Sequence, residues 1–171
     1  MSKHGGWRFG QTSFFLFGRW NFFSHHRNGH WQIRLHSVVA IYAACSKFER
    51  YETPLPKSYY QAFQAIEADP NNELIVACYH DEVVGVQQIT FTPYITHQGG
   101  WRATIEGVRI SSDVRGKGVG TKMIRWAIER TKERGCHLVQ LTTDKQRSKA
   151  LSFYDQLGFR STHEGLKMKI Y

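Results

Sequence analysis

The residues with the clearest chemical meaning form a short glycine-rich stretch, Arg115-Gly116-Lys117-Gly118-Val119-Gly120. It follows an apolar, β-branched run and precedes an amphipathic helix pattern. Glycines let the backbone turn sharply and approach a ligand closely. At a helix start, free N–H groups and the positive end of the helix dipole attract phosphate. The stretch therefore predicts a site for a phosphate-bearing cofactor, with Arg115 and Lys117 adding positive charge.

Two common phosphate-binding motifs fit this stretch poorly. A P-loop needs Gly-Lys-Ser/Thr, but Gly120 is followed by Thr121-Lys122. A dinucleotide fingerprint needs a third glycine where Thr121 lies, and its strand belongs to a parallel unit rather than to a meander. The P-loop is therefore excluded and the dinucleotide site is disfavoured. A tight turn without a ligand stays open as the structural alternative.

The elements that must position the glycine stretch follow from periodicity and from turn residues. Helices come first, then an antiparallel meander, then strand–loop–helix–strand–helix–strand, which indicates a mixed α/β or α+β sheet in three layers. The predicted elements are a strand over Trp31–Leu35, a helix over Val38–Lys47, a helix through Tyr59, Phe63 and Ile66 that stops before Asp69, a hairpin of Glu73–Tyr79 and Val83–Thr92, a strand over Trp101–Ile110, a helix from Val119 to about Arg134, a strand over His137–Thr142, a helix over Arg147–Gln156, and one or two strands within Phe159–Tyr171.

The composition limits the class of protein. A chain of 171 residues is long enough for one domain with a sizeable core. It holds no run of about 18 or more apolar residues, which argues against a membrane span. Cys45, Cys78 and Cys136 are odd in number and far apart, unlike a disulfide framework or a zinc site. They suit a reducing compartment, so we expect a cytoplasmic protein.

The net charge of +9 at first suggests a nucleic-acid partner. Residues 1–48 hold six basic residues and no acid, whereas residues 49–171 hold seventeen basic and fourteen acidic residues, a net charge of +3. Most of the excess therefore lies in the N-terminal segment, and the remainder of the chain is ordinary. The high pI is weak evidence for nucleic-acid binding, and we expect no such partner.

Residues 1–30 form an atypical extension. Residues 1–36 hold five of the nine His, three of the five Trp and six of the eleven Phe, without a period of 2 or 3.6. Either this segment is poorly ordered or it stems from a mistaken start site or a shifted reading frame. His25, His26 and His30 lack an acid or Cys partner that would complete a metal site, so no metal is expected.

The glycine stretch and the strand before it resemble those of the GNAT-type acyl-CoA N-acetyltransferase superfamily. Arg115, Gly118 and Gly120 lie at the positions of that family's Arg/Gln-x-x-Gly-x-Gly/Ala loop. Val108-Arg109-Ile110 comes directly before the loop, as the family's central strand does. The resemblance identifies the phosphate as the pyrophosphate of coenzyme A.

A second motif and the order of elements agree with this family. Phe153-Tyr154, followed by Leu157-Gly158-Phe159, is similar to its Phe-Tyr-x-x-x-Gly-Phe pattern, and order and spacing match over residues 49–171. Two departures stand out: Arg147 replaces a frequent Asn, and the pattern that begins with Ile33-Arg34 does not continue as in the family. Contacts credited to that Asn are therefore in doubt.

The resemblance implies a GNAT fold, in which a mostly antiparallel sheet is splayed between its fourth and fifth strands and carries helices on both faces. The N-acetyltransferase domain would span residues 31–171, with 49–171 as its best-supported part. Acetyl-CoA would be the co-substrate. By resemblance its pantetheine arm would contact Val108, Arg109 and Ile110, and its pyrophosphate would contact Arg115, Gly116, Lys117, Gly118, Val119, Gly120 and Thr121.

Two residues are candidates for proton transfer. Glu106 is the only acid between Glu82 and Asp113, and strict alternation places it on the same strand face as Val108 and Ile110. It is the candidate base, directly or through water, and a merely exposed or salt-bridged Glu is equally compatible. By resemblance Tyr154 is the general acid that protonates the leaving thiolate.

We therefore expect transfer of an acetyl group from acetyl-CoA to a primary amine, by direct attack in a ternary complex. A non-catalytic CoA-binding module is the alternative. The acceptor, a small molecule or a peptide amine, cannot be named from the sequence. Its pocket is expected between residues 38 and 69 and the 94–101 loop, where Tyr59, His97, Trp101 and Arg102 could line it. A homodimer stays open.

Overall fold

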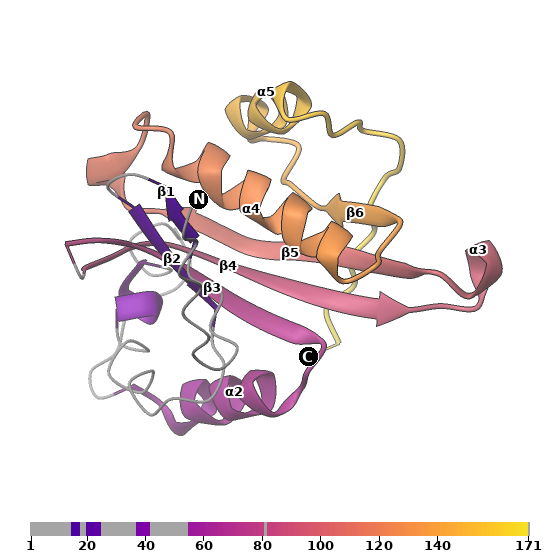
Figure 1. Ribbon diagram of the computed structural model, residues 1–171, viewed down its shortest axis with the longest axis horizontal. Helices are drawn as coiled ribbons and strands as arrows, with labels where there is room; N and C mark the ends of the chain where they lie inside the picture. The colour runs from indigo at the N-terminus through magenta and orange to yellow at the C-terminus, as the bar shows by residue number, and fades with distance from the viewer. Residues whose placement is uncertain (1–14, 18–19, 25–36, 42–54, 81, 171) are drawn as a thin grey trace, which may run out of the picture.

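The computed structural model describes residues 15–17, 20–24, 37–41, 55–80 and 82–170. Its centre is a six-stranded sheet in the order β1-β2-β3-β4-β5-β6 (Figure 1). Neighbouring strands are antiparallel, except that β5 and β6 run parallel. The mixed α/β class and the mostly antiparallel sheet are confirmed. The strands are β1 Phe15–Phe17, β2 Trp20–Ser24, β3 Asn72–Tyr79, β4 Glu82–Pro93, β5 Trp101–Ile110 and β6 Leu138–Leu141.

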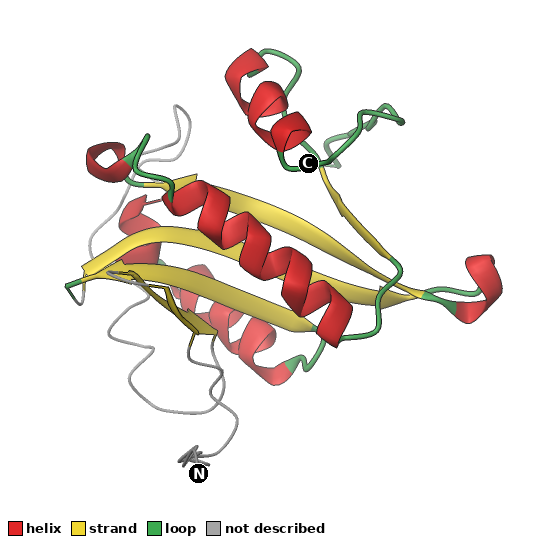
Figure 2. Ribbon diagram, turned by 45° about the horizontal axis from the view of Figure 1, so that its top comes forward, coloured by secondary structure: helices red, strands yellow, loops and turns green. Residues whose placement is uncertain are grey.

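Helices lie on both faces of the sheet (Figure 2). Helix α4, Val119–Glu133, crosses one face, and α2, Lys57–Ala68, packs on the other together with a short helix over residues 37–41. Helix α5, Ser148–Gln156, follows β6, while the short α3, Thr96–Gly99, and the 3-10 turn η1, Ser112–Val114, lie before and after β5. We call the two faces of the sheet the α4 side and the α2 side.

Each side of the sheet has its own hydrophobic core, because apolar residues of the strands alternate between the two faces. On the α4 side, Met123 and Ile124 pack against Ile89 and Ile105, all at most 1% exposed. On the α2 side, Phe63 is the buried anchor of α2. The predicted apolar stripe of α4 is therefore the stripe that faces the sheet.

A buried ion pair joins α4 to β3. The Glu73 side chain is 0% exposed, and its carboxylate accepts hydrogen bonds from Arg130 Nε at 3.0 Å and Nη2 at 2.7 Å. These hydrogen bonds raise the pKa of Arg130 above its ordinary value, against the opposing effect of burial. The fork geometry holds both charged groups in place and fixes α4 against the sheet.

The structure differs from the prediction at both ends of the chain. β1 and β2 extend the sheet where no regular element was predicted. The prediction of final strands after Phe159 is wrong for residues 159–170, which form no strand. Leu166 and Ile170 are 94% and 75% exposed there. A strand needs a paired edge and a covered apolar face, and this segment has neither. The predicted strand Trp31–Leu35 lies outside the described residues, as does the predicted helix beyond residue 41.

Candidate functional site

One extra residue interrupts β5 near its C-terminal end. Gln88 of β4 pairs with Glu106 of β5, and Val86 of β4 pairs with Arg109 of β5. Two steps along β4 therefore correspond to three steps along β5. The extra residue forms a β-bulge, and Gly107 takes a φ of 59° there, a conformation that favours glycine. The bulge shifts the inward–outward alternation of every residue after it.

The bulge overturns one argument made from the sequence. Val108 and Ile110 pack against the core on the α4 side. Glu106 is directly opposite Gln88, which lines a pocket on the α2 side, and cross-strand partners share a face. The prediction that Glu106 shares a face with Val108 and Ile110 is therefore wrong, because strict alternation takes no account of a bulge. The carboxylate of Glu106 is exposed on the α2 side.

The sheet splits beyond the middle of β5. Arg102–Ile105 pairs with Leu138–Leu141 of β6, and the parallel ladder ends there. Residues 106–110 continue without β6 beside them, which is visible as a gap between the two ribbons (Figure 2). This confirms the predicted splay, since β5 and β6 are the strands that were counted as fourth and fifth from the sequence. Backbone groups of β5 in the split have no partner from β6.

The glycine-rich loop closes the end of the split and begins α4. Gly116 and Gly118 have φ values of 76° and 79°, and open space lies where a side chain would project from either. Lys122 N–H donates to the Gly118 carbonyl oxygen at 3.1 Å, so the N–H groups of residues 119–121 are first-turn donors without partners inside the helix. First-turn N–H donors at the positive end of a helix suit an anionic phosphate group.

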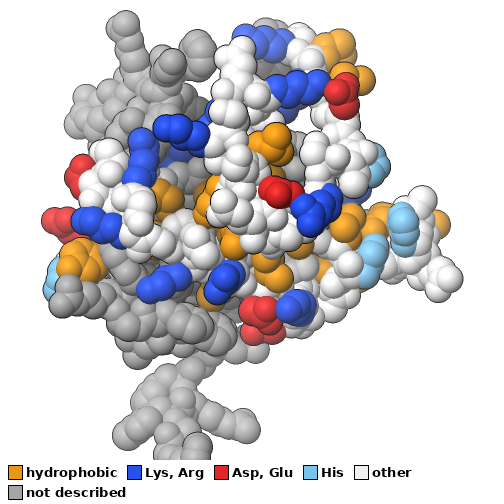
Figure 3. Space-filling model, turned by 90° about the horizontal axis from the view of Figure 1, so that it is seen from above, with side chains coloured by type: hydrophobic (Ala, Val, Ile, Leu, Met, Phe, Trp, Pro, Cys, Tyr) orange, Lys and Arg blue, Asp and Glu red, His pale blue; other side chains and the backbone are white. Residues whose placement is uncertain are grey.

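Cationic side chains surround this loop. Arg115 and Lys117 are exposed, and Arg115 Nε donates to the Ile110 carbonyl oxygen at 3.2 Å, which ties the loop to the end of β5. The face that carries α4 and α5 shows Lys and Arg side chains spread around a hollow with apolar side chains at its base (Figure 3). The electrostatic potential here favours an anionic ligand.

Tyr154 lies on α5, next to the glycine-rich loop. A methyl group on Gly120 would lie 3.5 Å from the Phe153 ring, and the Tyr154 ring meets that of Phe153 edge-on at 5.1 Å. Burial raises the pKa of the Tyr154 phenol, while the positive charges of Arg147 and Arg109 oppose that effect. The fold therefore brings Tyr154, the loop and the end of β5 together, and the phenol keeps its proton at neutral pH.

The residues expected to line the acceptor pocket fall into two places. Tyr59 lines a pocket beneath α2. His97, Trp101 and Arg102 instead lie at the start of β5, at the opposite end of that strand from the glycine-rich loop (Figure 1). There Arg102 stacks over Tyr94, 5.1 Å from its centroid. These three residues are not gathered around the split.

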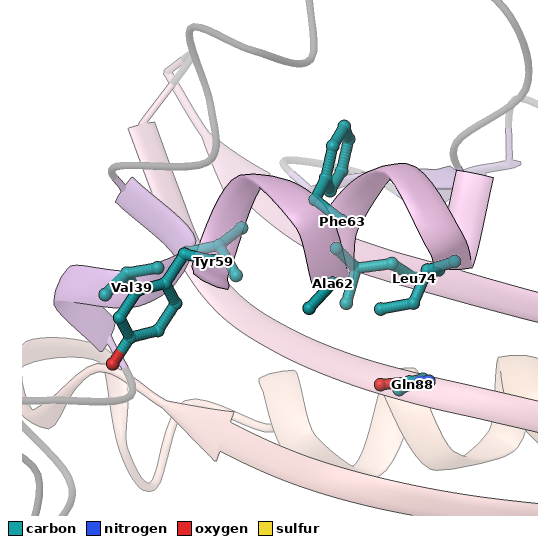
Figure 4. Close-up of a pocket in the computed structure, with 8 residues that line it drawn as sticks. Val39, Tyr59, Ala62, Phe63, Leu74 and Gln88 are labelled. Carbon is teal, nitrogen blue, oxygen red and sulfur yellow. The ribbon is translucent and has the colours of Figure 1, made fainter. Parts of the chain in front are cut away.

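The pocket beneath α2 has a volume of about 120 Å³ and lies between α2, the 37–41 helix and the sheet (Figure 4). Sequence reasoning placed the acceptor pocket partly within residues 38–69, and it missed Leu74 and Gln88 as lining residues. The sequence did carry a signal, since the two amides Gln87 and Gln88 interrupt the apolar residues of that strand. The lining residues are Val38, Val39, Tyr59, Ala62, Phe63, Ile66, Leu74 and Gln88.

Two negative findings concern only the described part of the chain. Within it, His, Cys, Asp and Glu residues do not assemble in threes as a metal ion would require. Across the same ranges, every helix is too short or too polar to cross a bilayer.

Comparison with known proteins gives consistent matches. The model of the acetyltransferase (GNAT) family matches residues 19–159. The chain is 30% identical over 108 residues to an aminoalkylphosphonate N-acetyltransferase of Salmonella typhimurium, covering 61% of this chain and 70% of the relative. A crystal structure of a transcriptional regulator from Bacillus halodurans is 56% identical and covers 86% of this chain and 98% of its own, with a TM-score of 0.79. A predicted acetyltransferase from Clostridium acetobutylicum, solved with acetyl-CoA, is 20% identical and has a TM-score of 0.66, covering 88% of this chain and 96% of its own. The chain belongs to the acetyltransferase (GNAT) family.

Proposed function

We propose that this chain transfers the acetyl group of acetyl-CoA to a primary amine of a small molecule, by direct attack in a ternary complex. The observation that carries the proposal is the arrangement at the split in the sheet. A phosphate-suited loop, the end of β5 beyond its pairing with β6 and a protonated phenol meet there. The name of the Salmonella relative supports a small amine as acceptor, and the Clostridium structure supports acetyl-CoA as donor.

The donor would bind along the split. Backbone groups of Val108, Arg109 and Ile110 would hold the pantetheine arm, and residues 115–121 would hold the pyrophosphate. Acetyl-CoA supplies an activated thioester when it is bound. A backbone N–H near Ile110 would stabilise the oxyanion that forms on the thioester carbonyl. A donor held in place by the strand is already oriented when the negative charge develops, so it does not have to move during the reaction.

Glu106 would prepare the acceptor. An alkyl ammonium has a pKa of about 10.4 and is almost fully protonated at neutral pH, so a proton must leave before attack. Glu106 is an exposed carboxylate on the α2 side, within reach of an amine that enters from that side. It would take the proton directly or through one water molecule.

Tyr154 would return a proton to the leaving group. A thiol has a pKa of about 8.5, below that of a phenol, so proton transfer from Tyr154 to the departing sulfur is uphill and would be coupled to breaking of the carbon–sulfur bond. The raised pKa of Tyr154 keeps the phenol protonated until the thiolate forms. The Arg109 and Arg147 charges would then stabilise the tyrosinate that remains.

Two measurements test the proposal. Calorimetry with acetyl-CoA should show saturable binding, and thiol release should occur with at least some members of a panel of primary amines. Binding without thiol release across the panel would leave the non-catalytic CoA-binding module as the function. Absence of acetyl-CoA binding would refute both, and titration with duplex DNA would then test the remaining explanation of the basic charge.

A further inference from the structure

The pocket beneath α2 is apolar. Apart from Gln88, its lining side chains are aliphatic or aromatic. The amide of Gln88 is already engaged, because its Nε2 donates to Asn72 Oδ1 at 2.9 Å. An apolar cavity of about 150 Å³ takes a benzene ring and stays dry without one, so 120 Å³ suits about four or five carbon atoms.

The pocket reaches the molecular surface. Val38, Phe63 and Leu74 form its buried wall, at 3%, 5% and 4% exposure. Ala62 is exposed on α2, and Gln88 is half-buried on β4, so these two residues lie at the mouth. Figure 4 shows Ala62 and Leu74 directed into the space between α2 and the strand that carries Gln88. A small molecule can therefore enter without the helix unfolding.

The mouth of the pocket is next to the candidate base. Leu74 pairs with Gln88, and Gln88 pairs with Glu106, so the three side chains form one row across β3, β4 and β5 on the α2 side. Adjacent strands lie about 4.8 Å apart, which places Glu106 about 5 Å from Gln88 and about 10 Å from Leu74 along the sheet. The row runs from an apolar wall to a carboxylate.

We infer that the acceptor is a primary amine whose nitrogen is joined to a short alkyl chain that fills this pocket. With the nitrogen at Glu106, the first two or three carbon atoms cross Gln88 and the rest enter the pocket. This inference rests on the proposed function and adds the class of acceptor.

An anionic end group fits the pocket poorly. None of the eight lining residues is a cation. A phosphonate or phosphate placed there would lose its hydration without gaining a partner, which is strongly unfavourable. The acceptor class therefore differs from the one named for the Salmonella relative.

A series of amines tests the inference through thiol release. For linear amines from methylamine to decylamine, kcat/KM should change little over the two or three carbon atoms that cross Gln88. It should then rise about fourfold per methylene as each group enters the pocket, until the pocket is full, and then level off or fall. 2-Aminoethylphosphonate should be a poor acceptor. A flat series, or a preference for the phosphonate over butylamine, would overturn the inference.

Two matched variants locate the effect. Ala62→Phe should fill the mouth and lower the ratio of kcat/KM for butylamine to that for methylamine by about tenfold or more. Ala65→Phe is the control, because Ala65 is an exposed alanine of the same helix that does not line the pocket. The melting temperatures of the two variants should agree, because each variant replaces an exposed alanine of the same helix by phenylalanine. Equal ratios in the two variants would contradict the pocket's role.

A binding measurement separates this inference from the proposed function. If acetyl-CoA binds and no amine reacts, the proposed function fails. Calorimetric titration of the coenzyme A complex with butylamine then tests whether the pocket binds an alkyl amine without any reaction. Binding by the wild type and by Ala65→Phe, together with loss of binding in Ala62→Phe, supports the inference. Equal binding by all three proteins, or by none, overturns it.

Discussion

Replacing Tyr154 by phenylalanine removes one oxygen atom and keeps the packing of the ring. The edge contact with Phe153, 5.1 Å between centroids, does not involve the hydroxyl. Among the described residues no hydrogen bond from this hydroxyl is found, so its loss should change the free energy of unfolding by less than about 1 kcal/mol. A general acid contributes about 10²- to 10⁴-fold, so kcat should fall by that factor. This corresponds to about 3–5 kcal/mol in the activation barrier.

The pH dependence of the same variant gives a second readout. Burial raises the pKa of Tyr154 above 10.0. The wild-type rate should therefore rise with pH as the amine loses its proton and fall only above pH 10, when the phenol ionises. Tyr154→Phe should lack the falling limb. Because the neutral phenol is favoured in the folded state, the wild type should also lose stability as pH rises from 10 toward the raised pKa, a loss absent in the variant.

The assay is thiol release at saturating acetyl-CoA, with acetyl-CoA affinity and thermal melting as controls. The reasoning requires a large fall in kcat with little change in either control. A kcat within about threefold of the wild-type value corresponds to a change of less than about 1 kcal/mol in the activation barrier. That result would remove Tyr154 from the mechanism. A parallel loss of melting temperature and coenzyme affinity would assign it a structural role instead.

Three further substitutions test other parts of the structure. Glu106→Gln should lower kcat/KM by about 100-fold or more with acetyl-CoA affinity unchanged, and a pH–rate profile identical to wild type would show that Glu106 is not the base. Gly118→Ala places a side chain at a φ of 79° and should cost about 1 kcal/mol of stability and weaken acetyl-CoA binding in calorimetry, whereas unchanged affinity would argue against a role for the loop backbone. Arg130→Met leaves the Glu73 carboxylate buried without its partner and should lower the free energy of unfolding in urea by about 3–5 kcal/mol, much of which Glu73→Gln in the same chain should restore.

The elements that surround the proposed donor site could be predicted from the sequence. The predicted bounds of β5 agree with the structure, and the predicted helix after the loop agrees with α4 to within one residue. Both have strong local signals. The strand is a β-branched and aromatic stretch that begins after Gly100, and the helix has a 3.6-residue apolar stripe that ends near Gly135. The loop itself was recognisable because three glycines between a strand and a helix have few other uses.

The α2 side could not be predicted in the same way, because its features depend on contacts between distant strands. The bulge at Gly107 appears only when the register of β4 against β5 is known. The pocket needs Ala62 and Gln88 to meet across the interface of α2 with the sheet. The C-terminal alternation of Leu166, Met168 and Ile170 is a strand pattern by composition, yet the segment lies exposed. Local periodicity gives a preference, and tertiary pairing decides whether it is realised.

The single extra residue in β5 has a consequence for how this member of the acetyltransferase family can evolve. The bulge assigns positions that would share a face in a regular strand to opposite sides of the sheet: Glu106 to the α2 side, Val108 and Ile110 to the α4 side. Under the proposed function, acceptor choice and donor binding are therefore under separate selection. Substitutions at the mouth of the pocket can change the preferred amine in duplicated genes, while the coenzyme site keeps its sequence and its rate.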